Sequence, residues 1–229
     1  MKKRYITLCL SYCLFLFTAC EKDVFEGVST LDTTPRTVAP FTKIKVGSVI
    51  EVFIEKSDQQ SVVIETNSNL TDQVLTTVNQ NTLEVSLKKG NYKNITVRIY
   101  IKVPHIEKLE FEDSSNGHLI FQTETLALEL SGSAEVTLEG SANTLNTELK
   151  NAGILHGYLF PKSVVNTKSE DASLMEINCI DALNGKVSEA AKVYYRGTPT
   201  INVELTEGGK CSVFELKITV IPRSSVSTI

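Results

Sequence analysis

Tryptophan is absent from this 229-residue sequence, and aromatic residues make up only 7% of it. Basic residues are also scarce, with 23 lysines and arginines against 27 aspartates and glutamates, for a formal net charge of −4. A protein that binds nucleic acid needs a basic surface to neutralise phosphates, so this balance argues against a nucleic-acid partner. Valine, isoleucine, leucine and threonine recur through most of the chain and favour β-strands.

Sequence motifs for catalysis, phosphate binding and metal binding are missing as well. The sequence contains no recognisable nucleophile–base pair, glycine-rich phosphate loop or paired metal-binding motif. It therefore predicts no catalytic residue, no metal site and no cofactor.

The first twenty residues have the pattern of an export signal. A basic stretch, Met1 to Arg4, precedes an apolar run from Ile6 to Phe17, and Thr18-Ala19-Cys20 follows. The run is short for a membrane span, which needs about 20 apolar residues. The arrangement resembles a lipobox, although Phe17 stands where leucine is commoner. We expect residues 1–19 to be a lipoprotein signal peptide and Cys20 to carry lipid that anchors the chain in an outer membrane, facing the periplasm or the cell surface. The alternatives are an ordinary signal peptide or an uncleaved helix.

Residues 20–40 are polar and hold two prolines, so the sequence predicts a flexible tether about 25 Å long. Within it, Asp32-Thr33-Thr34 resembles a bacterial O-glycosylation motif and makes Thr33 a candidate acceptor. A plain polar linker is the alternative interpretation.

Residues 41–103 alternate apolar and polar positions in several short runs, the pattern of half-buried strands. From Ile106 the sequence repeats itself about every 19 residues. Two columns define the repeat, one mostly apolar and one in which every member is small. The apolar column is Phe111, Leu130, Leu149, Lys168, Val187 and Leu205. The small column is Ser115, Ala134, Gly153, Ala172, Ala191 and Gly209.

This repeat predicts an all-β fold, a right-handed parallel β-helix in which each unit forms one coil. Coils stack about 4.8 Å apart, and stacking buries an apolar face that one coil cannot bury alone. The period is too short for a helical solenoid, and the leucine-rich signature is missing. An antiparallel sandwich is the alternative. We expect the domain to span residues 41–221, with Leu216 to Ile221 as a capping strand, and residues 222–229 to be a tail.

The repeat register also places the remaining cysteines and histidines. Cys179 and Cys211 could form a disulfide in an exported protein, but they fall in different columns nearly two coils apart, beyond disulfide reach. His118 and His156 share a column with Thr137 between them, which is too far apart for one zinc ion. We expect two free thiols and exposed histidines.

An acidic column contains Asp113, Glu170, Glu189 and Glu207. Glu170, Glu189 and Glu207 would repel one another unless they held a cation such as calcium, which prefers oxygen ligands. A solvated corner that tolerates like charge is the alternative.

Several of these segments resemble one known family. Ser131-Gly132-Ser133-Ala134 is similar to a coil corner of the GIN-domain proteins, and the segment from Val193 to Pro199 is similar to their terminal Tyr-x-Gly-x-Pro element. The resemblance extends over roughly residues 41–216. It implies a right-handed β-helix on secreted or lipid-anchored proteins, described as the head domain of auto-transporter adhesins. The corner glycines of the middle coils are replaced here, by Asn151-Ala152 for example.

The leading functional hypothesis is a non-catalytic, lipid-anchored envelope protein, an adhesin-like module that binds a glycan or protein. The alternatives are a β-helix carbohydrate-active enzyme and a purely structural lipoprotein that could self-associate. Tyr158, Tyr194 and Tyr195 are the candidate binding residues because tyrosine is enriched at binding surfaces.

Overall fold

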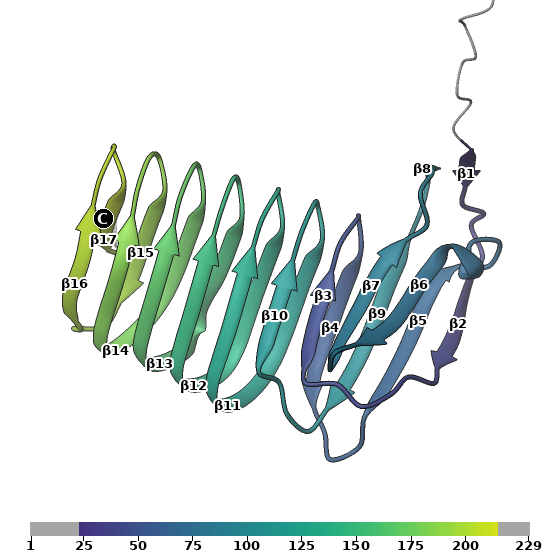
Figure 1. Cartoon of the computed structure of the whole chain (residues 1–229), viewed down its shortest axis with the longest axis horizontal. Helices are drawn as coiled ribbons and strands as arrows, with labels where there is room; N and C mark the ends of the chain where they lie inside the picture. Colours follow the sequence, from purple (N-terminus) through teal and green to yellow (C-terminus); the bar gives the residue numbers. More distant parts are fainter. Residues whose placement is uncertain (1–22, 215–229) are drawn as a thin grey trace, which may run out of the picture.

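The computed structural model describes residues 23–214, and most of these residues lie in β-strands. Strands β10–β17 form a row of stacked coils, a parallel β-helix (Figure 1). The only helical segment within residues 23–214 is one short 3-10 helix, η1, and no helix there is long and apolar enough to cross a membrane. The solenoid strands are β10 (Lys108–Phe111), β11 (Asn116–Leu130), β12 (Glu135–Leu149), β13 (Ile154–Ser169), β14 (Leu174–Val187), β15 (Lys192–Arg196), β16 (Thr200–Leu205) and β17 (Lys210–Val213).

Neighbouring coils pair in parallel, so equivalent residues lie side by side. Phe111 pairs with Leu130, and Leu130 pairs with Leu149, a spacing of 19 residues in both steps. These three side chains, together with Val187, are at most 1% exposed and form one interior ladder. The predicted fold and the apolar column are therefore confirmed for these coils.

The predicted register is wrong by one residue within β13. Leu149 pairs with Ser169 rather than Lys168, so this step is 20 residues long, and Ser169 to Val187 is 18. The extra residue enters β13 between His156 and Leu159, which pair with Thr137 and Glu139 of β12. Against β14 the register shifts again between Gly157 and Pro161 and between Lys162 and Val164.

The same shift moves two other predicted columns. Ser173 occupies the small corner position and is 1% exposed, whereas Ala172 is exposed. Met175, and not Leu174, pairs with Leu155 in the interior.

The N-terminal strands continue the stack and then close it. β3 and β4 pair in parallel with β10 and β11, and β7 and β9 pair in parallel with β3 and β4. Antiparallel strands β5 and β6 follow, and β2 covers β5, so this end of the sheet is capped (Figure 1). The elements are β1 (Val24–Glu26), β2 (Leu31–Arg36), β3 (Lys43–Val46), β4 (Glu51–Lys56), β5 (Ser61–Asn67), η1 (Thr71–Gln73), β6 (Val74–Asn79), β7 (Thr82–Leu87), β8 (Asn91–Lys93) and β9 (Val97–Val103).

The flexible tether predicted for residues 20–40 is wrong from Val24 onward. β1 pairs with β8, and β2 pairs with β5 over six residues. An existing sheet edge supplies hydrogen bonds to these strands, so they become ordered without burying much apolar surface. Pro35 is tolerated because β2 is an edge strand, and Arg36 Nη2 donates to the carbonyl of Thr71 at 3.0 Å.

The opposite end of the solenoid exposes apolar side chains among the described residues. Ile201, Leu205 and Val213 are 41%, 50% and 50% exposed in the last coil. The predicted capping strand Leu216 to Ile221 and the tail 222–229 lie outside the described residues, as do the signal peptide 1–19 and Cys20.

Candidate functional site

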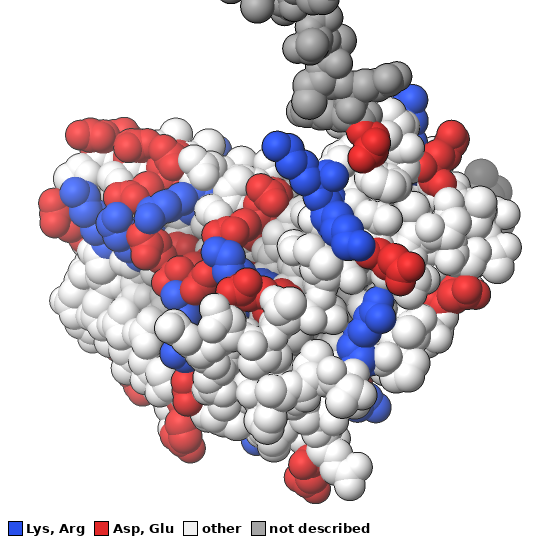
Figure 2. Space-filling view, turned by 45° about the vertical axis from the view of Figure 1, so that its right-hand side comes forward, with Lys and Arg blue, Asp and Glu red and all other residues white. Residues whose placement is uncertain are grey.

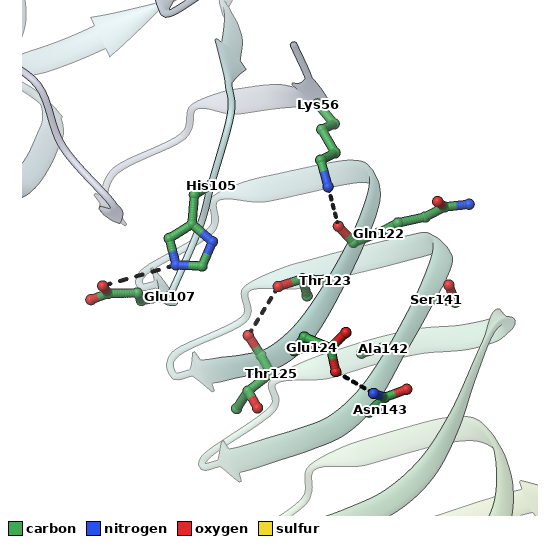
Figure 3. Close-up of a pocket in the computed structure, with 10 residues that line it drawn as sticks. All are labelled: Lys56, His105, Glu107, Gln122, Thr123, Glu124, Thr125, Ser141, Ala142 and Asn143. Atoms are coloured by element: carbon green, nitrogen blue, oxygen red, sulfur yellow. Dashed lines mark hydrogen bonds and ion pairs between the residues drawn. The ribbon is translucent and has the colours of Figure 1, made fainter. Parts of the chain in front are cut away.

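A groove lies where the coils bend, between the middles of β11 and β12 and the connection from β9 to β10 (Figure 3). Its volume is about 630 Å³, within the range of about 300–1,000 Å³ that is typical of small-molecule sites. Four parts of the chain supply its lining: the end of β4, the connection from β9 to β10, and the middles of β11 and β12. The residues are Lys56, His105, Glu107, Gln122, Thr123, Glu124, Thr125, Ser141, Ala142 and Asn143.

The stacked coils fix the polar side chains of this groove. Lys56 Nζ donates to the carbonyl of Gln122 at 2.9 Å, which ties the end of β4 to the bend of β11 (Figure 3). Asn143 Nδ2 donates to Glu124 Oε2 across adjacent coils. His105 Nε2 lies 3.9 Å from Glu107 Oε1 on the far wall.

The chemistry of the groove is that of hydrogen bonding rather than of strong charge. Amide and hydroxyl groups offer donors and acceptors together, and two carboxylates face one lysine and one histidine. A second hollow adjoins it, shares Lys56 and Gln122, and includes Ile120, which is 56% exposed. The two hollows together can contact a ligand that has both hydroxyl or amide groups and an apolar side.

Sequence reasoning missed this groove. Its signal is the pair of polar stretches Gln122 to Thr125 and Ser141 to Asn143, which precede the equivalent buried residues Leu126 and Leu145. The 19-residue repeat identifies these two stretches as equivalent bends. His105 also lines the groove, but it lies in the connection from β9 to β10, before the repeat begins.

The three candidate tyrosines do not converge on one exposed surface. Tyr158 packs against Phe214 with ring centroids 5.0 Å apart, and the Arg196 guanidinium lies 4.1 Å from the Tyr158 ring. The Tyr158 hydroxyl is buried without a hydrogen-bond partner, and this burial raises the pKa of Tyr158 to about 12. Tyr195 packs on the hydrophobic core, whereas Tyr194 is half-buried beside Glu176. The Tyr158 and Tyr195 rings both pack against other residues near the C-terminal end of the described chain.

Six corner residues stack in the left-handed backbone conformation, with φ between 52° and 69°: Asp113, Gly132, Asn151, Asp171, Glu189 and Glu207. Glu170, predicted for this ladder, lies one position earlier and pairs with Lys168 at 2.9 Å. Asp171 takes its place, again because β13 contains an extra residue. At Gly132 an added Cβ would lie 2.6 Å from the carbonyl oxygen of Asp113, which explains this glycine.

Protein groups contact Asp171 and Glu189 in this ladder. The Asn151 backbone N–H donates to Asp171 Oδ2 at 2.7 Å, and this bond, with a hydrogen bond from Glu189, lowers the pKa of Asp171. The same hydrogen bond and the charge of Asp171 raise the pKa of Glu189. Within the described residues no group of three or more histidines, cysteines, aspartates or glutamates is arranged to hold a metal ion.

The histidines occupy the predicted shared column, with His118 beside Thr137 and Thr137 beside His156. His156 contacts two carboxylates, Glu176 at 2.7 Å and Glu135 at 3.1 Å. His118 stacks on Phe53 at 5.0 Å between ring centroids, and Phe53 stacks on Tyr100 at 5.2 Å. This stack runs along the coil axis, so each ring covers its neighbour and the Phe53 ring is half-buried.

The remaining predicted positions are separate from the groove. Thr33 is exposed in β2 opposite Glu65, so its hydroxyl-bearing side chain lies on a paired strand and not on a flexible linker. Cys179 and Cys211 are both free, as predicted, and Cys179 is fully buried.

Comparison with known families and structures gives a consistent picture. A profile of the family described as "Putative auto-transporter adhesin, head GIN domain" matches residues 40–199. None of the curated proteins matches the chain.

Three solved structures with the same fold come from Bacteroidales. A putative adhesin from Bacteroides fragilis superposes with a TM-score of 0.68 at 20% identity, covering 82% of this chain and 99% of that one. A putative adhesin from Parabacteroides distasonis has a TM-score of 0.55 at 18% identity, covering 84% and 100%. A structure from the same species, titled as a putative lipid binding protein, has a TM-score of 0.54 at 13% identity, with the same coverage. At these identities the likeness shows the fold.

Proposed function

Because the chain belongs to the GIN-domain family of auto-transporter adhesin head domains, we propose that it is a non-catalytic, lipid-anchored envelope protein that binds a polar ligand in the groove at the coil bends. The observation that carries the binding role is the groove itself, in which donors and acceptors from four chain segments line a volume of about 630 Å³. Hydrogen bonds position the Lys56, Glu124 and Asn143 side chains, which reduces the conformational entropy that they lose on binding.

The anchor is supported by the sequence alone. The basic stretch from Met1 to Arg4, the apolar run and Thr18-Ala19-Cys20 together favour lipidation of Cys20. Many copies held on one membrane would bind a repetitive ligand with avidity, which adds about 10²–10⁴ to the apparent affinity. Weak individual contacts in an open groove are then sufficient for adhesion.

The test of the binding role is a screen of the mature protein against glycan and peptide arrays, followed by titration of the hits. Glu124→Ala and Asn143→Ala remove polar groups from the groove, whereas Glu204→Ala removes an exposed carboxylate from β16 as a matched control. We expect the two groove variants to weaken binding by roughly ten-fold, the effect of about one lost hydrogen bond. Equal binding by the groove and control variants would contradict this assignment.

Two further measurements test the other parts of the proposal. Labelled fatty acid should attach to the wild-type protein and not to Cys20→Ala, and label on the variant would exclude Cys20 as the anchor. The purified protein should release no new reducing ends from polysaccharides, with or without calcium. Sustained release in proportion to protein concentration would show that the protein is an enzyme.

A further inference from the structure

Residues 23–31 expose several large apolar side chains at one end of the molecule. Of the twelve large apolar side chains that are strongly exposed in the described chain, three lie here: Val24, Val28 and Leu31, at 56%, 45% and 38%. β1 and β8 stand together at this end, apart from the stacked coils (Figure 1). The same end is where the described chain begins.

Two aromatic rings add to this surface. Phe25 and Tyr92 stack with centroids 5.2 Å apart, and the Tyr92 hydroxyl donates to the carbonyl of Lys88 at 2.6 Å. An added Cβ at Gly90 would lie 2.5 Å from the Phe25 ring, so the ring packs directly on the backbone there. Both rings are half-buried: Phe25 is purely apolar, and Tyr92 has the amphipathic character of aromatic residues found at membrane interfaces.

Lysines surround these apolar groups. Lys88, Lys89 and Lys93 are all exposed, and the acids Asp23, Glu26 and Asp32 lie in or next to the same segment. Figure 2 shows basic side chains, with some acidic ones among them, on the face beside the point where the described chain begins. Such a mixture of exposed apolar groups and lysines complements a membrane surface that carries anionic headgroups.

The segment is held rigidly against the body. The Asn69 side chain accepts from the Val28 backbone N–H at 3.1 Å and donates to the carbonyl of Glu26 at 2.8 Å. The Asn67 side chain donates to the carbonyl of Val28 at 2.6 Å. These amides fix residues 26–28, so the apolar groups cannot fold back into the core.

The number of residues between Cys20 and β1 limits how far this surface can lie from the lipid. Cys20 precedes Val24 by four residues, which span about 14 Å at full extension. We infer that the β1–β8 end, presenting Val24, Val28, the Phe25–Tyr92 pair and Lys88, Lys89 and Lys93, docks on the anionic lipid surface in which Cys20 is anchored. The inference rests on the proposed lipidation of Cys20. Docking would hold the solenoid in a fixed orientation, in contrast to a body that swings on a tether.

The absence of tryptophan from the chain makes a direct test possible. Val28→Trp places a single fluorophore on the proposed docking surface, and Leu159→Trp places one at an exposed apolar position on the solenoid, where Leu159 is 66% exposed. The lipidated proteins are incorporated into vesicles of phosphatidylcholine and phosphatidylglycerol, with or without bromine on the acyl chains. Flotation with the vesicles verifies the anchor before fluorescence is measured.

We expect the emission of Val28→Trp to shift to shorter wavelength and to be quenched by brominated lipid, while Leu159→Trp shows neither change. In the Val28→Trp background, the double variant Lys88→Glu/Lys89→Glu should reduce the quenching. The control double variant Lys192→Glu/Lys210→Glu changes exposed lysines of the last coils and should leave the quenching unchanged. If the proteins float but the two tryptophans behave alike, docking is wrong and the anchor stands. If they do not float, the lipid anchor is wrong and this inference fails with it.

Discussion

Lys162 places an amine in the core of the solenoid, and its replacement by an apolar residue should stabilise the protein. The side chain is fully buried, and Lys162 borders a register irregularity between β13 and β14. Its amine has one hydrogen bond, to the carbonyl of Gly157 at 3.3 Å, and lies 5.1 Å from the centre of the Phe160 ring. Burial lowers the pKa of Lys162 to about 7 from the ordinary 10.5, because the interior does not solvate the ammonium.

The pKa values of Lys162 in the folded and unfolded chain set the size of its contribution to the unfolding free energy and the pH range over which that contribution changes. Below pH 7 the amine is protonated in both the folded and the unfolded chain, and its contribution to the unfolding free energy is constant. Between pH 7 and 10.5 only the unfolded chain binds the proton, so stability rises with pH. The full difference corresponds to on the order of 5 kcal/mol, of which about 2–3 kcal/mol falls between pH 7 and pH 9.

Urea unfolding of the wild type and of Lys162→Met at several pH values measures this contribution. Methionine fills a similar volume without a charge, so Lys162→Met should raise the unfolding free energy at pH 7 by about 2 kcal/mol or more. It should also remove most of the rise between pH 7 and 9. Lys192→Met, at an exposed position in β15, is the control and should change neither value. If Lys162→Met is less stable than the wild type at pH 7 and keeps the same pH dependence, the amine is not buried as described.

Two other predictions test the coil register. Leu149→Asp places a carboxylate in the fully buried ladder and should cost several kcal/mol, enough to unfold the domain or lower its melting temperature sharply by circular dichroism. Ser173→Phe should cost about 1–3 kcal/mol through overpacking of the small corner column, whereas Ala172→Phe, one residue away and exposed, should cost little. A larger loss of melting temperature for Ala172→Phe than for Ser173→Phe would favour the uninterrupted 19-residue register, in which Ala172 holds the corner position.

The sequence was sufficient to predict the solenoid because each repeat of the sequence corresponds to one coil, and equivalent residues of adjacent coils pack on one another. Interior positions such as Leu130 and Leu149 must match in every coil that stacks, and the spacing of such residues fixes the coil length. A bend can absorb one extra residue without disturbing the ladders on either side. The insertion in β13 therefore left the overall pattern visible but displaced Lys168, Ala172 and Glu170 from their predicted columns.

The N-terminal cap and the groove could not be predicted in the same way. β2 is ordered by hydrogen bonds to the edge of β5 and not by its own apolar residues, so hydropathy gives no sign of it. The groove needs His105 and Glu107, which come from the crossover after β9, next to the bends of β11 and β12. No period in the sequence links these segments.

The position of the groove along the stack follows from the strand order. The edge strand β2 is followed by β5, β9 and β4, and the groove begins at the end of β4. At about 4.8 Å for each strand, the groove lies roughly 15 Å from that edge, and the coils from β13 onward extend beyond it. If the β1–β8 end docks on the membrane as inferred, the groove opens on the side of the solenoid and not at its tip. A groove in that position suits a chain-like ligand, such as a saccharide or an extended peptide, that can reach the side of the coils.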